Sequence, residues 1–214
     1  MEIKIENASL ELKNNLILDN ISYILKGGNR YGLIGHNGSG KTMLLRAICG
    51  FVRLNSGNVT IDGYEIGTKG HEFIDNAGVI VGEIDFYKDL SGIDNLRLLA
   101  KIRNVIGEEE IKEAISEVGL SGRENIKYRK YSTGMKARLR IAQAIMEKPQ
   151  VLILDEPFNG LDKAGVESIS KVIDEYIHGE RMLIITSHHE EDINKLCNTV
   201  LEIDGGKLIN EYSI

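Results

Sequence analysis

The sequence predicts an α/β fold in which a mixed or parallel core sheet is joined to an antiparallel β unit near the N-terminus and to an inserted helical unit. Two short, fully apolar runs, Val151–Leu154 and Met182–Ile185, flank a segment with the spacing of an amphipathic helix. Such runs are typical of parallel strands buried on both faces, and the order strand, helix, strand implies a right-handed crossover. Between about residues 85 and 148, apolar residues recur at helical spacing instead.

The first third of the chain has the pattern of strands and turns around one short helix. Apolar and polar residues alternate at 3–5, and a Gly-Gly pair at 27–28 predicts a turn before an apolar segment at 31–35. A helix is expected over 40–50, because glycine is favoured just beyond a last helical turn. Residues 58–61, followed by Asp-Gly, predict half of a hairpin.

The rest of the chain predicts helices and a closing hairpin. Helical spacing runs over 93–100, 111–118 and 135–146 in the middle, and over 166–177 between the two apolar strands. An Asp-Gly-Gly turn at 204–206 predicts the final hairpin.

The chain shows no internal repeat and no linker composition. We therefore expect one domain over residues 1–214, with a helical insertion at about 85–148.

Composition and charge limit the classes of partner. The chain has 214 residues with 26 basic and 32 acidic side chains, a net charge of −6 and a pI of about 5.5. An acidic chain without a long basic run argues against nucleic acid as the main partner. No apolar run reaches the roughly 18 residues that cross a bilayer, and the N-terminus has the pattern of neither a signal peptide nor an anchor. Cys49 and Cys197 are expected to be free thiols.

A glycine-rich segment between a predicted strand and a predicted helix has the spacing of a phosphate-binding loop. Its members are Gly35, His36, Asn37, Gly38, Ser39, Gly40, Lys41 and Thr42. They fit the pattern G-x4-G-K-[ST], in which glycines let many N–H donors converge on phosphate oxygens. Lys41 is expected to bridge the outer phosphates and the Thr42 hydroxyl to bind Mg²⁺. The motif alone names no reaction, because kinases, GTPases and motors all use it.

Two neighbouring carboxylates, Asp155 and Glu156, follow the first apolar strand. Side chains alternate along an extended chain, so the two carboxylates are expected to diverge. Asp155 is then expected on the metal side, and Glu156 is the candidate general base for an attacking water.

A polar group also follows the second apolar strand. Ligands bind at the carboxyl ends of strands in open parallel sheets, so we expect His188 to touch a γ-phosphate or to orient water. Ser132 precedes another predicted helix, and local physics allows two roles for it: a plain N-cap or a ligand. The residues alone leave that choice open.

Together these segments resemble the nucleotide-binding domain of ATP-binding cassette (ABC) transporters over residues 3–208. The resemblance rests on a Walker A loop at 35–42, a Walker B strand at 151–156, a D-loop containing Asp162 and a switch histidine, His188. The signature segment consists of Ser132, Thr133, Gly134 and Met135. Its Tyr-Ser-Thr-Gly-Met-Lys variant resembles the branch that exports antibiotics and peptides, including bacitracin- and lantibiotic-resistance systems.

The resemblance implies a P-loop NTPase fold that hydrolyses ATP with Mg²⁺ in a head-to-tail dimer of two nucleotide-binding domains. Ser132 and Gly134 of one subunit would cap the γ-phosphate held by the other, and Asp162 would couple the two sites. Hydrolysis would use Glu156 and His188. The resemblance also implies a separate transmembrane permease, which would hold the chain on the cytoplasmic, inner face of the cell membrane.

The sequence departs from the family pattern in three places. Leu12 stands where the family usually stacks an aromatic residue on adenine, so apolar packing would replace stacking. The Q-loop glutamine is missing: Gly82 takes its position, and the adjacent Glu83 is the candidate oxygen ligand for Mg²⁺. Thr133 and Met135 replace the commoner Gly and Gln of the signature.

Two alternatives to a hydrolysing transporter subunit follow from the same residues. One is a non-transport ABC ATPase acting on ribosomes or DNA, but such proteins usually carry two cassettes or long coiled coils, and this sequence shows neither. The other is a nucleotide-gated regulatory subunit with little turnover, which the changed adenine and Q-loop positions favour. A phosphate-release assay separates this second alternative from an active ATPase.

Overall fold

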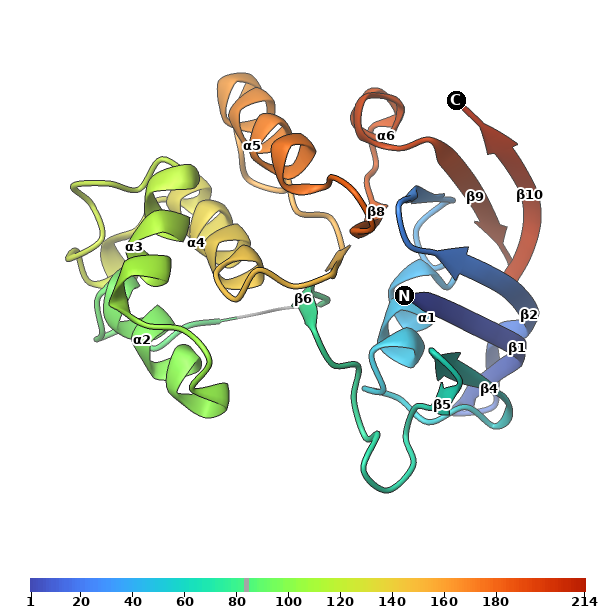
Figure 1. Cartoon of the computed structure of the whole chain (residues 1–214). Coiled ribbons are helices and arrows are strands. Elements are labelled where there is room, and N and C mark those ends of the chain that lie inside the picture. Colours follow the sequence, from blue (N-terminus) through green and yellow to red (C-terminus); the bar gives the residue numbers. More distant parts are fainter. Residues whose placement is uncertain (83–84) are drawn as a thin grey trace.

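The computed structural model describes residues 1–82 and 85–214, which form two sheets with helices between and beside them (Figure 1). The strands are β1 (Glu2–Leu12), β2 (Asn15–Lys26), β3 (Arg30–Ile34), β4 (Ser56–Ile61), β5 (Tyr64–Glu65), β6 (Ala77–Ile80), β7 (Val151–Leu154), β8 (Met182–Thr186), β9 (Thr199–Asp204) and β10 (Lys207–Ser213). The helices are α1 (Lys41–Ile48), α2 (Gly92–Arg103), α3 (Glu108–Glu117), α4 (Thr133–Ile145), α5 (Lys163–Tyr176) and α6 (Glu190–Leu196), with a 3-10 turn η1 (Tyr128–Lys130).

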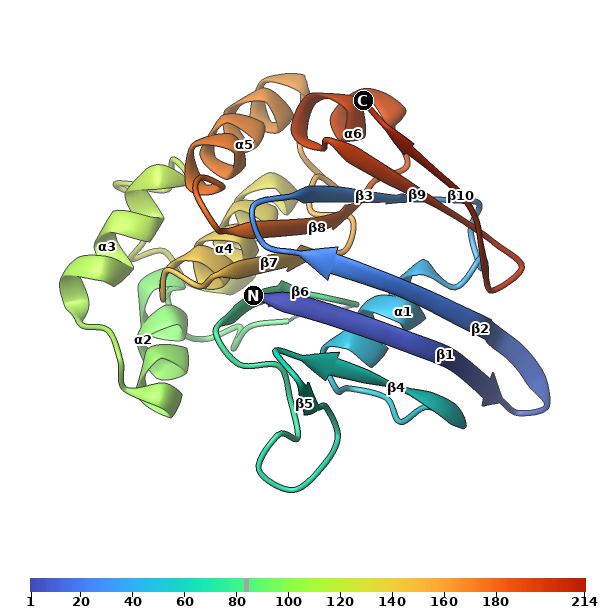
Figure 2. The ribbon, with the colours of Figure 1, turned by 45° about the vertical axis from the view of Figure 1, so that its right-hand side comes forward.

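The two sheets differ in the direction of their strands. The N-terminal sheet has the order β2-β1-β4-β5, and its pairs are antiparallel. The core sheet has the order β10-β9-β3-β8-β7-β6 and is parallel except for the β9–β10 pair. Figure 2 shows the antiparallel strands β1, β2 and β4 lying across from β3, β7 and β8. The predicted α/β fold, with a mixed core sheet and an antiparallel N-terminal unit, is confirmed.

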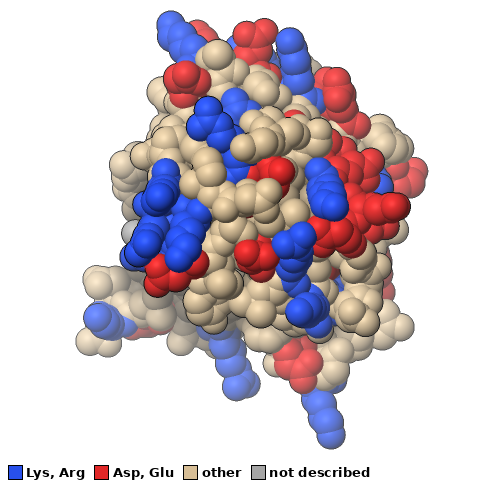
Figure 3. Space-filling view, turned by 90° about the vertical axis from the view of Figure 1, so that its left-hand side faces the viewer, with Lys and Arg blue, Asp and Glu red and all other residues tan. Residues whose placement is uncertain are grey.

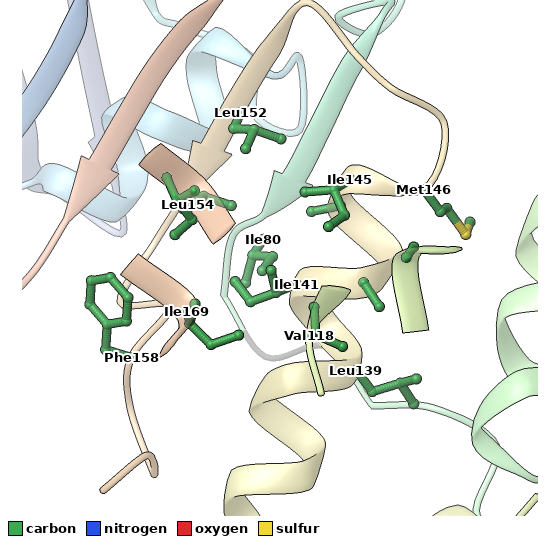
Figure 4. Close-up of a cluster of buried hydrophobic side chains, with 14 of the residues drawn as sticks. Ile80, Val118, Leu139, Ile141, Ile145, Met146, Leu152, Leu154, Phe158 and Ile169 are labelled. Carbon is green, nitrogen blue, oxygen red and sulfur yellow. The ribbon is translucent and has the colours of Figure 1, made fainter. Parts of the chain in front are cut away.

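The apolar runs predicted as buried strands are β7 and β8, and both faces of each are covered. Alternate side chains point to opposite faces of a strand. Leu152 and Leu154 accordingly join the apolar cluster on the helical side, drawn in Figure 4, while Val151 and Ile153 join a second cluster on the other side. This two-sided burial explains why the strand carries no polar residue before Asp155.

Helix α1 lies between the two sheets. Its apolar residues Leu44, Leu45 and Ile48 are buried in the second cluster, together with Ile3 of β1 and Leu33 of β3. Because α1 follows β3 directly, its N-terminus is held at the carboxyl end of that strand. The glycine-rich loop is therefore anchored by a strand on one side and a buried helix on the other.

Helices α2, α3 and α4 follow one another between β6 and β7 (Figure 1). Ion pairs link them on the surface: Arg97 of α2 contacts Glu108 of α3, and Lys148 Nζ lies 2.8 Å from Glu113 Oε2. The face of the molecule that carries α2 and α3 has basic and acidic side chains next to one another (Figure 3). Such exposed pairs contribute only about 0–1 kcal/mol each, so the buried cluster does more to hold the helices together.

Several elements have no counterpart among the sequence-based predictions, including β2, β6 and α6. Strand β6 is only four residues long and contains Gly78, a residue that weakens strands, so its formation depends on parallel pairing with β7. Helix α6 begins with three acidic residues and has a weak apolar pattern. Its Ile193 is nevertheless buried and packs where Gly32 leaves space on β3.

The helices and the two cysteines of the structure bear on a membrane span and on the state of the thiols. Within the described ranges, no helix combines the length and the apolar character that a bilayer crossing requires. Cys49 and Cys197 are both free and buried, and burial raises the pKa of each thiol to about 12. Both cysteines therefore behave as small apolar core residues.

We predict that Gly78→Ala lowers the free energy of unfolding by about 2 kcal/mol, because overpacking a filled core has a cost of this size. A Cβ atom at residue 78 would lie 2.0 Å from the backbone oxygen of Ala144 in α4. Gly107→Ala is the control, since the nearest atom to its Cβ would be 3.5 Å away. Urea unfolding measures both variants, and equal midpoints for the two would contradict this account of β6.

Candidate active site

The predicted site residues from three strand ends meet in one cleft of about 290 Å³. The cleft lies where β3, β7 and β8 end and α1 begins. Its lining residues are Ile17, Asn37, Gly38, Ser39, Gly40, Lys41, Thr42, Met43, Asp155, Glu156 and His188. The Walker A loop, the carboxylate pair and the switch histidine are therefore brought together, as the sequence predicted.

The glycines of the loop have different reasons to be glycine. Gly35 has a φ of +147°, and a Cβ there would lie 2.1 Å from the backbone oxygen of Ile203, so close packing excludes a side chain. Gly38 has a φ of +83°, but its Cβ would meet nothing within 4 Å. Protein packing therefore explains the glycine at position 35, where the end of β9 lies against the loop, and leaves open space at Gly38.

Lys41 holds its ammonium group inside the loop. Its Nζ donates hydrogen bonds to the backbone oxygens of Gly35, at 2.7 Å, and His36, at 3.0 Å, and only 7% of the residue is exposed. At the start of α1, Gly40 provides no side-chain cap for the free N–H groups. A buried cation beside uncapped N–H donors forms a site for an anion.

Asp155 is held on both of its oxygens. The Thr42 hydroxyl donates to Oδ2 at 2.8 Å, and the Thr186 hydroxyl donates to Oδ1 at 2.8 Å. The backbone N–H of Glu156 donates to the same Thr186 oxygen at 2.9 Å. Thr186 was not among the predicted site residues, although a threonine at the end of an otherwise apolar strand is a visible signal.

Glu156 does not lie in the extended strand from which its divergence from Asp155 was predicted. Strand β7 ends at Leu154, and Glu156 has a left-handed backbone with a φ of +51°. Strand alternation therefore does not set the direction of the Glu156 side chain. Its Oε1 lies 3.2 Å from Nε2 of His188. Burial raises the pKa of the Glu156 carboxyl, while the nearby histidine opposes that shift, so Glu156 is a stronger proton acceptor than an exposed glutamate.

The donors around Thr42 and Asp155 suit a hard divalent cation that also binds phosphate. Their side-chain oxygens lie 2.8 Å apart at the foot of the cleft. Among the described residues, no group of three or more His, Cys, Asp or Glu side chains could hold a metal ion on its own. A cation here would therefore take its other ligands from phosphate and water, which is the usual behaviour of Mg²⁺.

The signature and D-loop residues do not line this cleft. Ser132 is the N-cap of α4, accepting the Met135 N–H at 3.2 Å, and Asp162 caps α5, accepting the Gly165 N–H at 2.7 Å. The two segments touch, because a Cβ on Gly160 would lie 2.4 Å from Cγ2 of Thr133. Within one chain, Ser132 therefore has the plain N-cap role that the sequence left open.

Leu12 and Glu83 were the residues expected to act at the adenine and in the Q-loop. Leu12 ends β1 with 42% of its surface exposed, and it is not among the residues that line the cleft. Ile17 of β2 lines it instead. Gly82 has a φ of +75° and packs against the guanidinium of Arg46. Glu83, the candidate metal ligand, lies outside the described residues.

The geometry defines a class of protein. A parallel sheet carries a glycine loop, a helix N-terminus with lysine and threonine, and a carboxylate pair on a nearby strand end. This is the arrangement of a P-loop nucleoside triphosphatase.

Comparison with known proteins assigns the family. The sequence matches the ABC transporter family over residues 18–159. The uncharacterised ABC transporter ATP-binding protein YybJ of Bacillus subtilis (strain 168) is 41% identical over 96% of this chain and 94% of its own. The bacitracin transport ATP-binding protein BcrA of Enterococcus faecalis is 32% identical over 99% of this chain and 69% of its own. A bacterial ABC transporter cassette solved as a dimer is 20% identical with a TM-score of 0.87, over 99% of this chain and 98% of that one.

The chain belongs to the ABC transporter ATP-binding family. It is an ATP-binding subunit of that family and an ATPase.

We predict that Lys41→Ala weakens ATP binding on the order of 100-fold, because a hydrogen bond to a charged group contributes about 1.5–3 kcal/mol. Isothermal titration with ATP measures the affinity. Lys171→Ala is the control, since Lys171 is exposed on α5 and pairs only with Glu167 in the described residues. An affinity for Lys41→Ala within twofold of the control would remove Lys41 from the phosphate site.

Proposed function

We propose that this ATPase drives a separate permease on the cytoplasmic face of the cell membrane, and that the transporter exports a peptide, antibiotic or drug. The observation that carries the ATPase chemistry is the cleft in which Lys41, Thr42, Asp155, Glu156 and His188 meet. Export is supported by the signature variant at Ser132–Lys136 and by the similarity to a bacitracin transport protein.

In the proposed reaction the triphosphate lies along the glycine loop. Lys41 and the N–H groups at the start of α1 hold the outer phosphates. Glu156 accepts a proton from water as the water oxygen bonds to the γ-phosphorus, and the bond to the β-phosphate oxygen breaks to release ADP. His188, 3.2 Å from Glu156, contacts the γ-phosphate or orients that water. Bound Mg²⁺, held by Thr42 and Asp155, would neutralise phosphate charge.

A second nucleotide-binding domain completes the site in this proposal. The cleft is open to solvent, and the N-terminus of α4 with Ser132 lies outside it. That helix end is positively polarised and carries no acidic residue in its first turn, so it suits a γ-phosphate bound by another subunit. Thr133, Gly134 and Met135 would approach with it. Asp162, in contact with the same surface through the D-loop, would couple the two sites.

We predict that Glu156→Gln lowers the turnover number by roughly 10²–10⁴-fold, the usual contribution of a general base, while ATP binding is retained. Trapped ATP should then hold two chains together. Phosphate release measures turnover, and size-exclusion chromatography with ATP measures the dimer. Glu167→Gln is the control, because Glu167 is exposed on α5 and pairs with Lys171. Normal turnover in Glu156→Gln would exclude Glu156 as the base.

We further propose that the permease docks where the helical insertion at about 85–148 meets the rest of a domain spanning 1–214. Ile102 at the end of α2 is 78% exposed, and Phe73 before β6 is 61% exposed. The nearby Arg103 and Asp75 form an ion pair at 2.7 Å, so the segments that carry Ile102 and Phe73 lie next to each other. Phe51 contacts Phe73 and adds a third exposed apolar side chain to this region. An exposed apolar surface of this kind marks a protein interface.

We predict that Phe73→Ser with Ile102→Ser reduces binding of the chain to permease-containing membranes at least about tenfold, because both side chains would lose apolar contacts. ATP binding by the free chain should stay within twofold of the unmodified protein, since neither residue lines the cleft. Ile209→Ser on β10, also exposed, is the matched control. Undiminished membrane binding by the double variant would place the permease elsewhere.

A further inference from the structure

Thr186 is a fully buried polar residue beside the reacting groups, and the mechanism above gives it no role. It is the last residue of β8, and its relative exposure is 0%. The parallel register pairs Leu154 of β7 with Ile185 of β8, so the next residues along the two strands, Asp155 and Thr186, are neighbours. The register of the sheet therefore places the Thr186 hydroxyl next to the carboxylate pair.

The Thr186 hydroxyl acts both as a hydrogen-bond donor and as an acceptor. Its proton is donated to Oδ1 of Asp155 at 2.8 Å, and its oxygen accepts the backbone N–H of Glu156 at 2.9 Å. A single side-chain atom thus touches both members of the pair. The first contact leaves Oδ2 of Asp155 facing Thr42, whose hydroxyl donates to it at 2.8 Å.

The second contact acts on the backbone of the candidate base. Glu156 is a non-glycine residue in the left-handed region, with a φ of +51°, which L-residues seldom adopt without support. The hydrogen bond from its N–H to Thr186 supplies support at the residue where the chain turns. The direction of the Glu156 side chain toward His188 depends on this turn.

We propose that Thr186 is a positioning residue that sets the metal-side acid and the general base in one geometry through its hydroxyl group. The proposal rests on the functions assigned to Asp155 and Glu156. Partners that orient ligands in this way typically change metal affinity or activity by about 10- to 100-fold when removed. Valine has nearly the shape of threonine but no hydroxyl, so Thr186→Val would leave Oδ1 of Asp155 and the Glu156 N–H without this partner.

The test compares Thr186→Val with Thr186→Ser, which keeps the hydroxyl. In Thr186→Val we expect the turnover number for ATP to fall about 10- to 100-fold. In Thr186→Ser we expect it to stay within about threefold of the unmodified chain. Thr60→Val, in the antiparallel sheet, is the control for losing a threonine hydroxyl elsewhere. If Thr186→Val does not yield folded protein, the pair Thr186→Ser and Thr186→Ala gives the same comparison.

A second readout needs no turnover. ADP affinity is measured by titration calorimetry with Mg²⁺ and again with EDTA. Loss of the hydroxyl should weaken ADP binding in Mg²⁺ about tenfold or more and leave binding in EDTA within twofold, because Asp155 acts through the cation. Equal weakening in both buffers, normal binding in both, or an equal loss in Thr186→Ser would overturn the proposal.

Glu156→Gln is included so that two kinds of failure are distinguished. If Glu156→Gln still hydrolyses ATP normally, the assigned general base is wrong, and the proposed reaction at this site fails with it. If Glu156→Gln is inactive while Thr186→Val hydrolyses ATP normally, only the role of Thr186 is excluded.

Discussion

Parallel pairing of β3, β8 and β7 is the constraint on which the site depends. Because these strands run in the same direction, their carboxyl ends lie side by side, and each ends in a different chemical group. The glycine loop follows β3, the carboxylate pair follows β7, and the histidine follows β8. Two-sided burial of β7 and β8 makes a shift in register costly, so the relative position of these groups follows from the apolar core.

The β9–β10 turn adds a second support for the glycine loop. The N–H of Gly206 donates to the backbone oxygen of Ser39 at 3.0 Å, and Nε2 of His36 lies 2.8 Å from Asp204. The loop is thus held from the side of the C-terminal hairpin as well as by β3 and α1. A loop that must present N–H donors to an anion benefits from such support, because donors that are already oriented need not be ordered during binding.

Much of the fold was predictable because its signals are local. The apolar strands, the G-x4-G-K-[ST] spacing and the helical periods are properties of short segments, and the corresponding elements are present. What sequence reasoning missed depends on distant segments. Strand β6 exists through pairing with β7, and Ile17 reaches the cleft only because the N-terminal sheet folds back over the loop. Thr186 gains its importance from the strand beside it.

At two of the predicted site residues, the backbone and packing differ from those assumed in the prediction. Glu156 was expected to diverge from Asp155 by strand alternation, but it lies beyond the end of β7 and its backbone is left-handed. Gly35 was expected to make room for phosphate, and it makes room for Ile203. Residue identity at such positions follows from the pattern of the motif, whereas the physical cause requires backbone angles and neighbours that a sequence does not contain.

The contact between Thr133 and Gly160 has a consequence for exchanging parts between cassettes. The methyl group of Thr133 occupies the space where any side chain at position 160 would begin. The two segments therefore have to be considered together sterically, although positions 133 and 160 are 27 positions apart in the sequence. A chimera that imports this threonine-containing segment must import a glycine at the matching D-loop position with it.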